Sequence, residues 1–438
     1  MPLLLTLLAI LTLVVLVAWF KLETFIAFLI ISLGVGFASG LDPQRTMAAV
    51  TRGIGSTLGS LVIILGFGAM LGKLVGDSGA AQRITTALLG WFGPARIQWA
   101  LALAGFIVGL PLFYTAGFVI LVPLVFTAVA TTRLPLMQVA IPMLASLSVA
   151  HGYLPPHPSP TAIAQQLHAS LSLTLVYGII VAIPAIIIAG PLFARTLKHR
   201  TAGHAPAGFA AKTLPDDQLP GLGISIVSAL LPVFLLASSA ILLPILPDPH
   251  PARFVVTTIG EPHIAMLLSL LVAIYLLGLR RGQSMAAVMR QLEEGFKSVA
   301  MILLIVAGAG AFMAVLNETG VSKYIGEQLN ALHAPPLVLG WGIAAVIRVC
   351  VGSATVAGLT TVGIVLPLLA EHAVTPELMV LAIGSGSLMF SHLNDGGFWI
   401  FKEYFDLSIK DTLATWSVME TIVSIAGLIG VLVLDWFV

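Results

Sequence analysis

The chain has 438 residues, of which 58% are hydrophobic and 9% charged, and its formal net charge is +1. A soluble protein carries roughly 25% charged residues, so this composition indicates a polytopic membrane protein, with the lipid bilayer as its surroundings. The near-zero charge excludes nucleic acid as a partner. The one cysteine, Cys350, excludes a disulfide framework and a metal cluster, and we expect it to pack as a small apolar side chain.

Apolar segments of spanning length recur along the chain. The first series covers residues 3–20, 22–40, 57–76, 97–130, 135–166 and 172–194, and the second covers 223–246, 262–279, 298–316, 338–370, 377–405 and 413–436. The first segment has no preceding Lys or Arg and no small-residue cleavage site, which indicates a retained span rather than a signal peptide.

The two series match in order and character, which predicts an internal repeat. Each third segment is rich in glycine and ends in an acid, a hydroxyl and a glycine, Asp77-Ser78-Gly79 or Glu318-Thr319-Gly320. The histidines of the fifth segments, His151 and His392, are 241 residues apart, close to the 242 residues between Gly68 and Gly310. The predicted domains are a first repeat (1–194), a polar cytoplasmic linker (195–222) and a second repeat (223–438).

The fourth segments, 97–130 and 338–370, are too long for one span and are interrupted by glycine and proline. A re-entrant hairpin with a small polar tip at mid-membrane fits both, and two ordinary spans is the alternative. If the hairpins do not cross the membrane, each repeat crosses it five times. Because five is odd, the second repeat starts on the opposite side of the membrane from the first and is therefore inverted. The predicted fold class is an all-α polytopic membrane protein of two inverted repeats. Each repeat has about five transmembrane helices, a re-entrant hairpin and a broken helix.

The basic residues fall unevenly in this topology. Of the 20 lysines and arginines, all but Arg45, Arg52, Arg253, Lys323 and Arg348 lie on one side. By the positive-inside rule that side is cytoplasmic, so both termini are predicted to be extracytoplasmic. Reading the hairpins as pairs of ordinary spans leaves this sidedness unchanged.

The first broken helix lies at His151-Gly-Tyr-Leu-Pro-Pro-His-Pro-Ser-Pro-Thr161. Four prolines in eleven residues forbid a continuous helix, and broken backbone at membrane depth survives only inside protein or along a wet cavity. We therefore predict that His151, His157, Ser159 and Thr161 bind a polar solute. Either histidine is also a candidate for proton transfer. We expect one of them to have a structural role instead, as a hydrogen-bond donor to a backbone carbonyl that the helix break leaves without a partner.

The hairpin tips supply the second group of candidates. Helix N-termini at a tip suit a carboxylate, because their N–H groups are free and their dipole ends are positive. The predicted substrate-binding residues there are Tyr114, Thr115, Gly117, Gly352, Ser353 and Thr355. Interhelical packing by small residues is the alternative reading of the hydroxyls.

The second broken helix reads Ser391-His-Leu-Asn-Asp-Gly-Gly-Phe398. His392 and Asn394 are candidate substrate ligands, and Asp395 is the strongest candidate for the coupling proton, with a helix cap as its alternative role. Arg348, in an otherwise apolar limb, either clamps the substrate carboxylate or pairs with an acid such as Asp395.

These motifs resemble the gluconate:proton symporter (gluconate permease) family, within the wider ion transporter superfamily. The resemblance runs nearly end to end and is carried by Gly66-Phe-Gly-Ala-Met-Leu-Gly-Lys73, Gln82-Arg83-Ile84, Leu154-Pro-Pro-His-Pro158, Pro160-Thr-Ala-Ile-Ala164, Gly352-Ser-Ala-Thr-Val356, Asn394-Asp395 and Phe401-Lys-Glu-Tyr-Phe405. Two positions depart from the family pattern. Thr115 stands where the family usually has an acid, and Gly396 stands where it usually has proline.

The resemblance implies proton-coupled uptake of a small anionic sugar acid across the bacterial inner membrane. It also implies a scaffold with a moving transport domain, often in a homodimer. Sodium coupling, another small carboxylate, a passive anion channel and an intramembrane enzyme remain the alternatives. No Walker loop, Rossmann fingerprint or HExxH motif occurs, so no cofactor or metal is predicted and the proton motive force is the expected drive.

Overall fold

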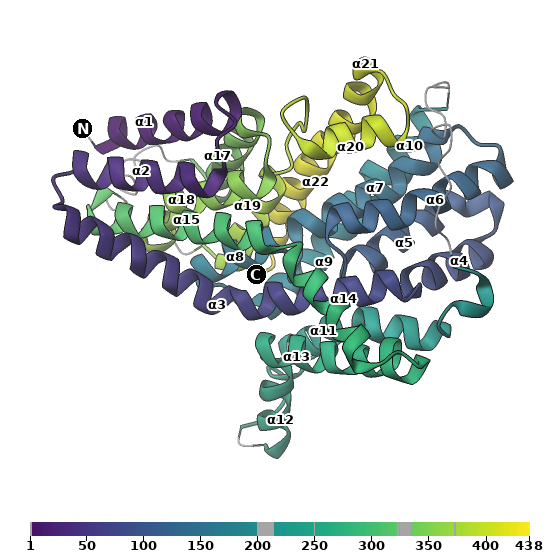
Figure 1. The fold of residues 1–438 in the computed structure, drawn as a ribbon. Coiled ribbons are helices and arrows are strands. Elements are labelled where there is room, and N and C mark those ends of the chain that lie inside the picture. Colours follow the sequence, from purple (N-terminus) through teal and green to yellow (C-terminus); the bar gives the residue numbers. More distant parts are fainter. Residues whose placement is uncertain (1, 199–213, 249, 322–323, 325–333, 372–373) are drawn as a thin grey trace.

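The computed structural model describes residues 2–198, 214–248, 250–321, 324, 334–371 and 374–438, and within them every regular element is helical. Part of the predicted linker, residues 199–213, lies outside the described residues, as do the predicted cytoplasmic Arg200 and Lys212 and the predicted extracytoplasmic Lys323. The molecule is elongated, with α1 and α2 at one end, α4 to α6 at the other, and α9 and α22 between them (Figure 1).

The helices of the first half end before the gap at residue 199. They are α1 (Pro2–Val14), η1 (Val15–Trp19), α2 (Thr24–Ala38), α3 (Pro43–Asp77), α4 (Ala80–Phe92), η2 (Pro94–Arg96), α5 (Ile97–Gly109), α6 (Tyr114–Thr132), α7 (Leu136–Tyr153), α8 (Pro158–Gln166), α9 (Leu171–Ile187), η3 (Ile188–Leu192) and α10 (Phe193–Thr196).

The second half begins after that gap. Its helices are η4 (Asp216–Gln218), α11 (Leu222–Leu242), α12 (Pro251–Gly260), α13 (Pro262–Ala273), η5 (Ile274–Gly278), η6 (Leu279–Arg281), α14 (Met285–Lys297), α15 (Ala300–Glu318), α17 (Pro336–Val351), α18 (Ala354–Glu371), α19 (Pro376–Gly386), α20 (Gly396–Tyr404), α21 (Ile409–Thr412), η7 (Leu413–Ser417) and α22 (Val418–Leu434).

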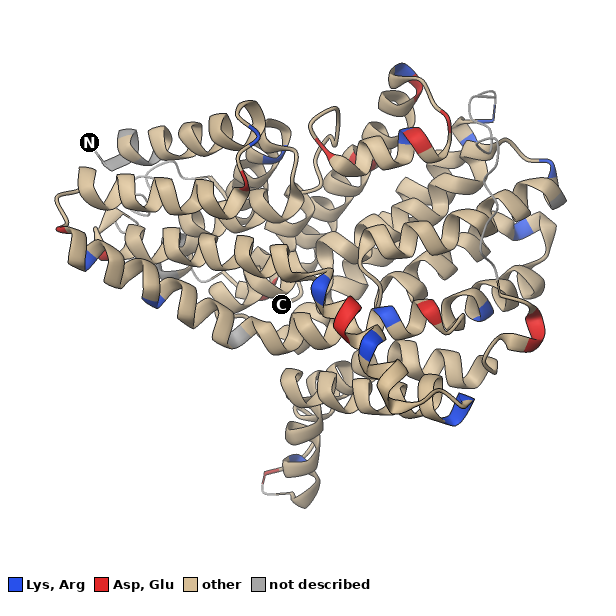
Figure 2. Ribbon diagram, in the orientation of Figure 1, with Lys and Arg blue, Asp and Glu red and all other residues tan. Residues whose placement is uncertain are grey.

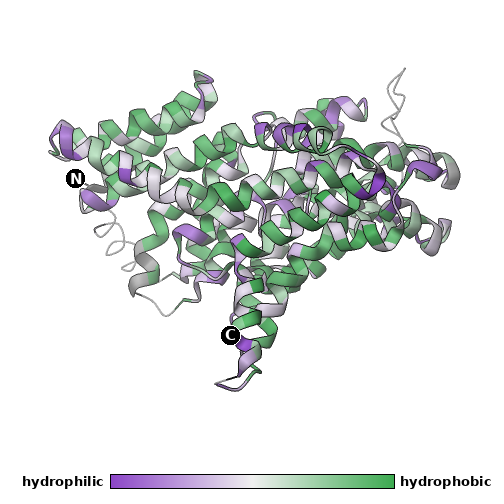
Figure 3. Cartoon of the chain, turned by 60° about the horizontal axis from the view of Figure 1, so that its bottom comes forward, coloured by the Kyte–Doolittle hydropathy of each residue, from purple (hydrophilic) through white to green (hydrophobic). Residues whose placement is uncertain are grey.

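Apolar composition makes these helices suited to lipid. Six of the described helices, or eight if each of two bent pairs is one span, are long and apolar enough to cross a membrane. Hydrophobic residues dominate the helices, and hydrophilic residues gather at the connections (Figure 3). Lys, Arg, Asp and Glu likewise lie mostly at helix ends and connections (Figure 2).

The predicted interruptions are present in both halves. The first tip, residues 110–113, joins α5 to α6, and the second tip, Gly352 and Ser353, joins α17 to α18. The first break, residues 154–157, separates α7 from α8 and contains two of the four prolines. The second break, residues 387–395, separates α19 from α20. Elements therefore recur in corresponding order, while the inverted orientation and the re-entrance of the hairpins stay predictions.

The two acid-hydroxyl-glycine turns also correspond. α3 ends at Asp77 and α15 at Glu318, and the glycines that follow, Gly79 and Gly320, have φ of 79° and 72°. Only glycine adopts this left-handed conformation without steric cost. Both third segments therefore end at these acids, as predicted.

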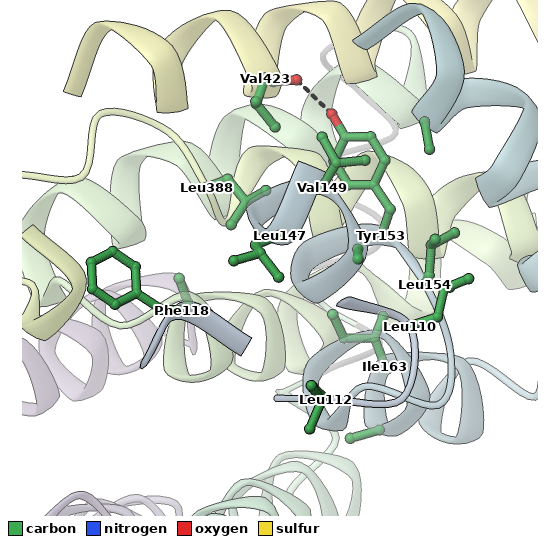
Figure 4. Packing of buried hydrophobic residues seen from close by; sticks show 14 of the residues in the cluster. Leu110, Leu112, Phe118, Leu147, Val149, Tyr153, Leu154, Ile163, Leu388 and Val423 are labelled. Carbon is green, nitrogen blue, oxygen red and sulfur yellow. Dashed lines mark hydrogen bonds between the residues drawn. The ribbon is translucent and has the colours of Figure 1, made fainter. Parts of the chain in front are cut away.

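Close packing joins elements far apart in the sequence. α3 and α15 approach so closely that a Cβ on Gly53 would lie 2.4 Å from the carbonyl oxygen of Gly310. Tyr153 at the end of α7 is fully buried, and its hydroxyl donates a hydrogen bond to the carbonyl oxygen of Val423 in α22 at 2.5 Å (Figure 4). This bond ties the first break to the last helix.

Two features differ from the predictions. α4 was not predicted, because its sequence is less apolar than its neighbours. Cys350 is exposed on α17, so its predicted packing was wrong.

Candidate functional site

The main cavity of the described residues, about 920 Å³, lies where the discontinuous elements meet. Its walls come from the start of α6, the end of α7, the second tip, the second break and the segment from η7 to the start of α22. Val17 and Ala18 of η1 and Lys21, two residues after it, also line the cavity. This volume falls within the range of small-molecule sites.

Most of the predicted site residues meet at this cavity. Those that line it are Tyr114, Thr115, His151, Arg348, Gly352, Ser353, Thr355, His392, Asn394 and Asp395. Those that do not line it are Gly117, His157, Ser159 and Thr161.

The centre of the cavity wall is an ion pair between Arg348 and Asp395. The Nη2 of Arg348 lies 2.5 Å from Oδ2 of Asp395, and Nη1 donates to the carbonyl oxygen of Gly352. The arginine side chain is 4% exposed and the aspartate side chain 18%. Of the two roles predicted for Arg348, this structure contains the pairing with Asp395.

Asp395 is also the N-cap of α20. Its Oδ1 accepts the backbone N–H of Gly397 at 3.0 Å, and its Oδ2 accepts the hydroxyl of Ser391 as well as Arg348. Trp416 in η7 donates its indole N–H to Ser391 Oγ at 2.7 Å. The carboxylate is therefore held by α17, the second break and α20. Asp395 has the predicted cap role and also lines the cavity.

The second break docks on the C-terminal end of α17. His392 Nε2 lies 3.0 Å from the carbonyl oxygen of Val349, and Asn394 Nδ2 donates to the same oxygen at 2.8 Å. A carbonyl in the last turn of a helix has no partner within that helix, so the two side chains satisfy this one. Gly352 permits the approach, because its φ is 81° and a Cβ there would lie 2.2 Å from the carbonyl oxygen of Asn394.

Both tips lead into helix N-termini, as predicted. α6 begins at Tyr114, so Thr115 lies in its first turn and is exposed to the cavity. α18 begins after Ser353, whose Oγ accepts the N–H of Val356 at 3.4 Å. Positive dipole ends from both halves thus face one space.

The four predicted residues that do not line the cavity are buried between helices. His157 Nε2 donates to the carbonyl oxygen of Gly109 at 2.7 Å, the bond to a freed carbonyl that we expected of one histidine. Ser159 and Thr161 are fully buried in α8, which packs against α18 at Gly358. Gly117 is buried against Leu147.

Sequence reasoning missed two buried polar residues of the cavity wall. Glu420 of α22 and Ser148 of α7 both line the cavity, and the serine hydroxyl donates to Glu420 Oε1. Glu420 lies well inside the apolar segment 413–436, whose other acid, Asp435, is at its end; this was the available signal, since charged residues inside spans are rare and functional. The described residues contain no group of three or more His, Cys, Asp or Glu placed to hold a metal ion.

Comparison with known proteins gives matches along the whole chain. Residues 1–437 match the family model described as GntP family permease. The chain is 47% identical to the high-affinity gluconate transporter of Escherichia coli (strain K12) and 45% identical to its Gnt-II system L-idonate transporter, each over 99% of both chains. It is 43% identical to the gluconate permease of Bacillus subtilis (strain 168), again over 99% of both.

Two solved structures share the fold. The YdaH transporter of Alcanivorax borkumensis aligns with a TM-score of 0.66 at 18% identity, covering 94% of this chain and 98% of that one. MtrF of Neisseria gonorrhoeae aligns with a TM-score of 0.67 at 17% identity, covering 90% and 85%. The relatives are named permeases and transporters rather than enzymes, which confirms the family and the transport class predicted from the sequence.

Proposed function

Because the chain belongs to the GntP permease family, a multi-pass bacterial membrane family, we propose that it takes up gluconate or a related sugar acid together with protons. The observation that carries this proposal is the Arg348–Asp395 ion pair on the wall of a cavity of about 920 Å³. A charged pair that borders a space of this size offers a cation to an anionic substrate.

The substrate carboxylate competes with Asp395 for Arg348. A guanidinium binds any carboxylate through the same planar fork of N–H donors, so a bound sugar acid takes over the contact that Asp395 makes with Arg348. The dipole ends of α6 and α18 favour the same negative group.

Displacement of Asp395 from Arg348 couples the binding of substrate to the binding of a proton. Two carboxylates beside one arginine leave an uncompensated negative charge, and a proton on Asp395 removes it. The loaded site then holds one arginine, one anion and one neutral acid, and its net charge equals that of the empty site. His151 and His157 are the other candidates for proton transfer.

The hydroxyl chain of the substrate faces the remaining polar groups of the wall. Thr115, Ser353 and Thr355 offer hydroxyls, and among the described residues the Tyr114 hydroxyl and His151 Nδ1 have no hydrogen-bond partner. Because Thr115 is uncharged, this tip does not repel an anion.

The proposed cycle is alternating access by two inverted repeats with both termini outside the bacterial inner membrane, and a homodimer is the proposed assembly. Sodium is the alternative coupling ion and a passive channel the alternative mode. Accumulation driven by a sodium gradient alone would select the first of these. Lack of accumulation under any gradient would select the second.

The test is Asp395→Asn in proteoliposomes, with gradient-driven uptake and counterflow measured on the same purified protein. Asparagine caps a helix nearly as well as aspartate but binds no proton. We expect accumulation driven by a pH gradient to fall well below that of the wild type, because the variant carries one proton fewer per gluconate, and exchange of labelled for unlabelled gluconate to persist. Asp42→Asn is the matched control, because Asp42 caps α3 on the surface. Normal pH-driven accumulation in Asp395→Asn would exclude this residue as the carrier.

A further inference from the structure

A second carboxyl group, that of Glu420, lines the cavity and forms no ion pair among the described residues. Its residue is 2% exposed, Ser148 Oγ donates to its Oε1, and its Oε2 has no hydrogen-bond partner among the described residues. Arg348 lines the same cavity but forms its ion pair with Asp395. An ionised carboxylate buried in this way is costly, whereas a protonated one is not.

The surroundings of Glu420 are mostly neutral. The charged and titratable side chains that line the same cavity are Lys21, Tyr114, His151, Arg348, His392 and Asp395, and those on the other parts of the helices packed on α22 are Tyr153, Tyr177, Cys350 and Glu377. Tyr153 is committed to Val423, and Glu377 accepts the backbone N–H of Ser170. Of this set, Lys21 and Arg348 are the cations, and the charge of Arg348 is matched by Asp395.

The helix places Glu420 for exchange with the cavity. α22 begins at Val418, directly after the π-helix η7, whose Trp416 bonds Ser391 of the second break. π-Helical turns inside longer helices occur frequently at functional sites. Movement of the second break during transport would therefore act on the turn that carries Glu420.

We propose that Glu420 is a second proton-binding carboxyl of the transport cycle, an inference that rests on the proposed function. The proton binds Oε2 from the outer solution, while Ser148 continues to donate to Oε1. The neutral acid then faces the anionic substrate and offers its O–H to a substrate oxygen. After the substrate leaves inward, the proton passes from Oε2 to cytoplasmic water.

This assignment changes the charge moved per cycle. One gluconate anion with the Asp395 proton alone is electroneutral, whereas a further proton on Glu420 gives one net positive charge inward. A potential of about 59 mV, negative inside, then supports about tenfold accumulation without a pH gradient. Glu420→Gln, which binds no proton, should respond to a pH gradient but not to the potential.

The experiment measures labelled gluconate uptake into proteoliposomes under an imposed potential or an imposed pH gradient. Full-length wild type and Glu420→Gln are compared, and counterflow shows that the variant is folded. A wild-type response to potential that is lost in Glu420→Gln supports the proposal. A wild type insensitive to potential, or a variant as sensitive as the wild type, overturns it.

Two further readouts complete the test. If Glu420→Gln does not fold, the reversal potential of wild-type transport still decides, since we expect two protons per gluconate and one proton would overturn the proposal. If the wild type shows no uptake under a pH gradient, the proton coupling of the proposed function itself is refuted, and this second site with it.

Discussion

Replacing Arg348 with methionine removes the cation on which the proposed function depends while keeping a side chain of similar length. Asp395 would then be left without its partner. Breaking a buried ion pair by removing one member costs about 3–5 kcal/mol. Because the Asp395 side chain is 18% exposed at the cavity, we expect a loss near the lower end, about 3 kcal/mol.

The same substitution weakens gluconate binding, because it also removes the proposed hydrogen bond from Arg348 to the substrate carboxylate. A hydrogen bond to a charged group contributes about 1.5–3 kcal/mol, so gluconate affinity should fall by roughly ten- to a hundredfold. The double variant Arg348→Met/Asp395→Asn separates the two effects. It has no unpaired charge, so it should recover most of the stability, yet it should bind gluconate as weakly as Arg348→Met.

The assay is thermal unfolding in detergent, with calorimetric titration of gluconate on the same samples. Arg45→Met is the matched control, because the Arg45 side chain is 63% exposed and pairs with Glu318 far from the cavity. Such surface pairs contribute about 0–1 kcal/mol, so both properties should stay near wild type. Wild-type affinity in the double variant would refute the role of Arg348 as the carboxylate ligand.

Three further predictions follow from the tip and the topology. Ser353→Ala and Thr355→Ala should each weaken gluconate binding roughly ten- to a hundredfold in calorimetric titration, with little change in thermal stability. Gly352→Ala should lower the unfolding temperature and abolish binding, because its φ of 81° costs a side chain about 1–2 kcal/mol and its Cβ would lie 2.2 Å from a backbone oxygen of the second break. Gly34→Ala, which meets nothing within 4 Å, should change neither property. Cysteines at both ends of a Cys350-free variant should react with impermeant maleimide in intact cells, and labelling only after permeabilisation would exclude outward termini.

Local chemistry made the breaks and tips predictable from the sequence. Proline removes a backbone donor, so the cluster at Pro155, Pro156 and Pro158 has to interrupt a helix. Gly352 and the glycines after Asp395 mark the other interruptions, because glycine adopts conformations that other residues avoid. Each of these signals lies within a few residues of the feature that it predicts.

Long-range pairing was not predictable in the same way. Ser148 and Glu420 are 272 residues apart in the sequence, and no local pattern links them. The polar atoms of His392 and Asn394 are largely committed to carbonyls of α17, a contact that depends on how the second break folds back. α4 was missed because its Gln82, Arg83 and threonines lower its apolar content, although tertiary packing makes it a regular helix.

Proton uptake on binding tests the central claim most directly. Gluconate is added to purified protein in weakly buffered detergent solution, and a pH indicator reports the protons taken up per gluconate bound. We expect the wild type to take up at least one proton per gluconate and Asp395→Asn to take up one fewer. Binding of gluconate by the wild type without any proton uptake would contradict the exchange of partners at Arg348.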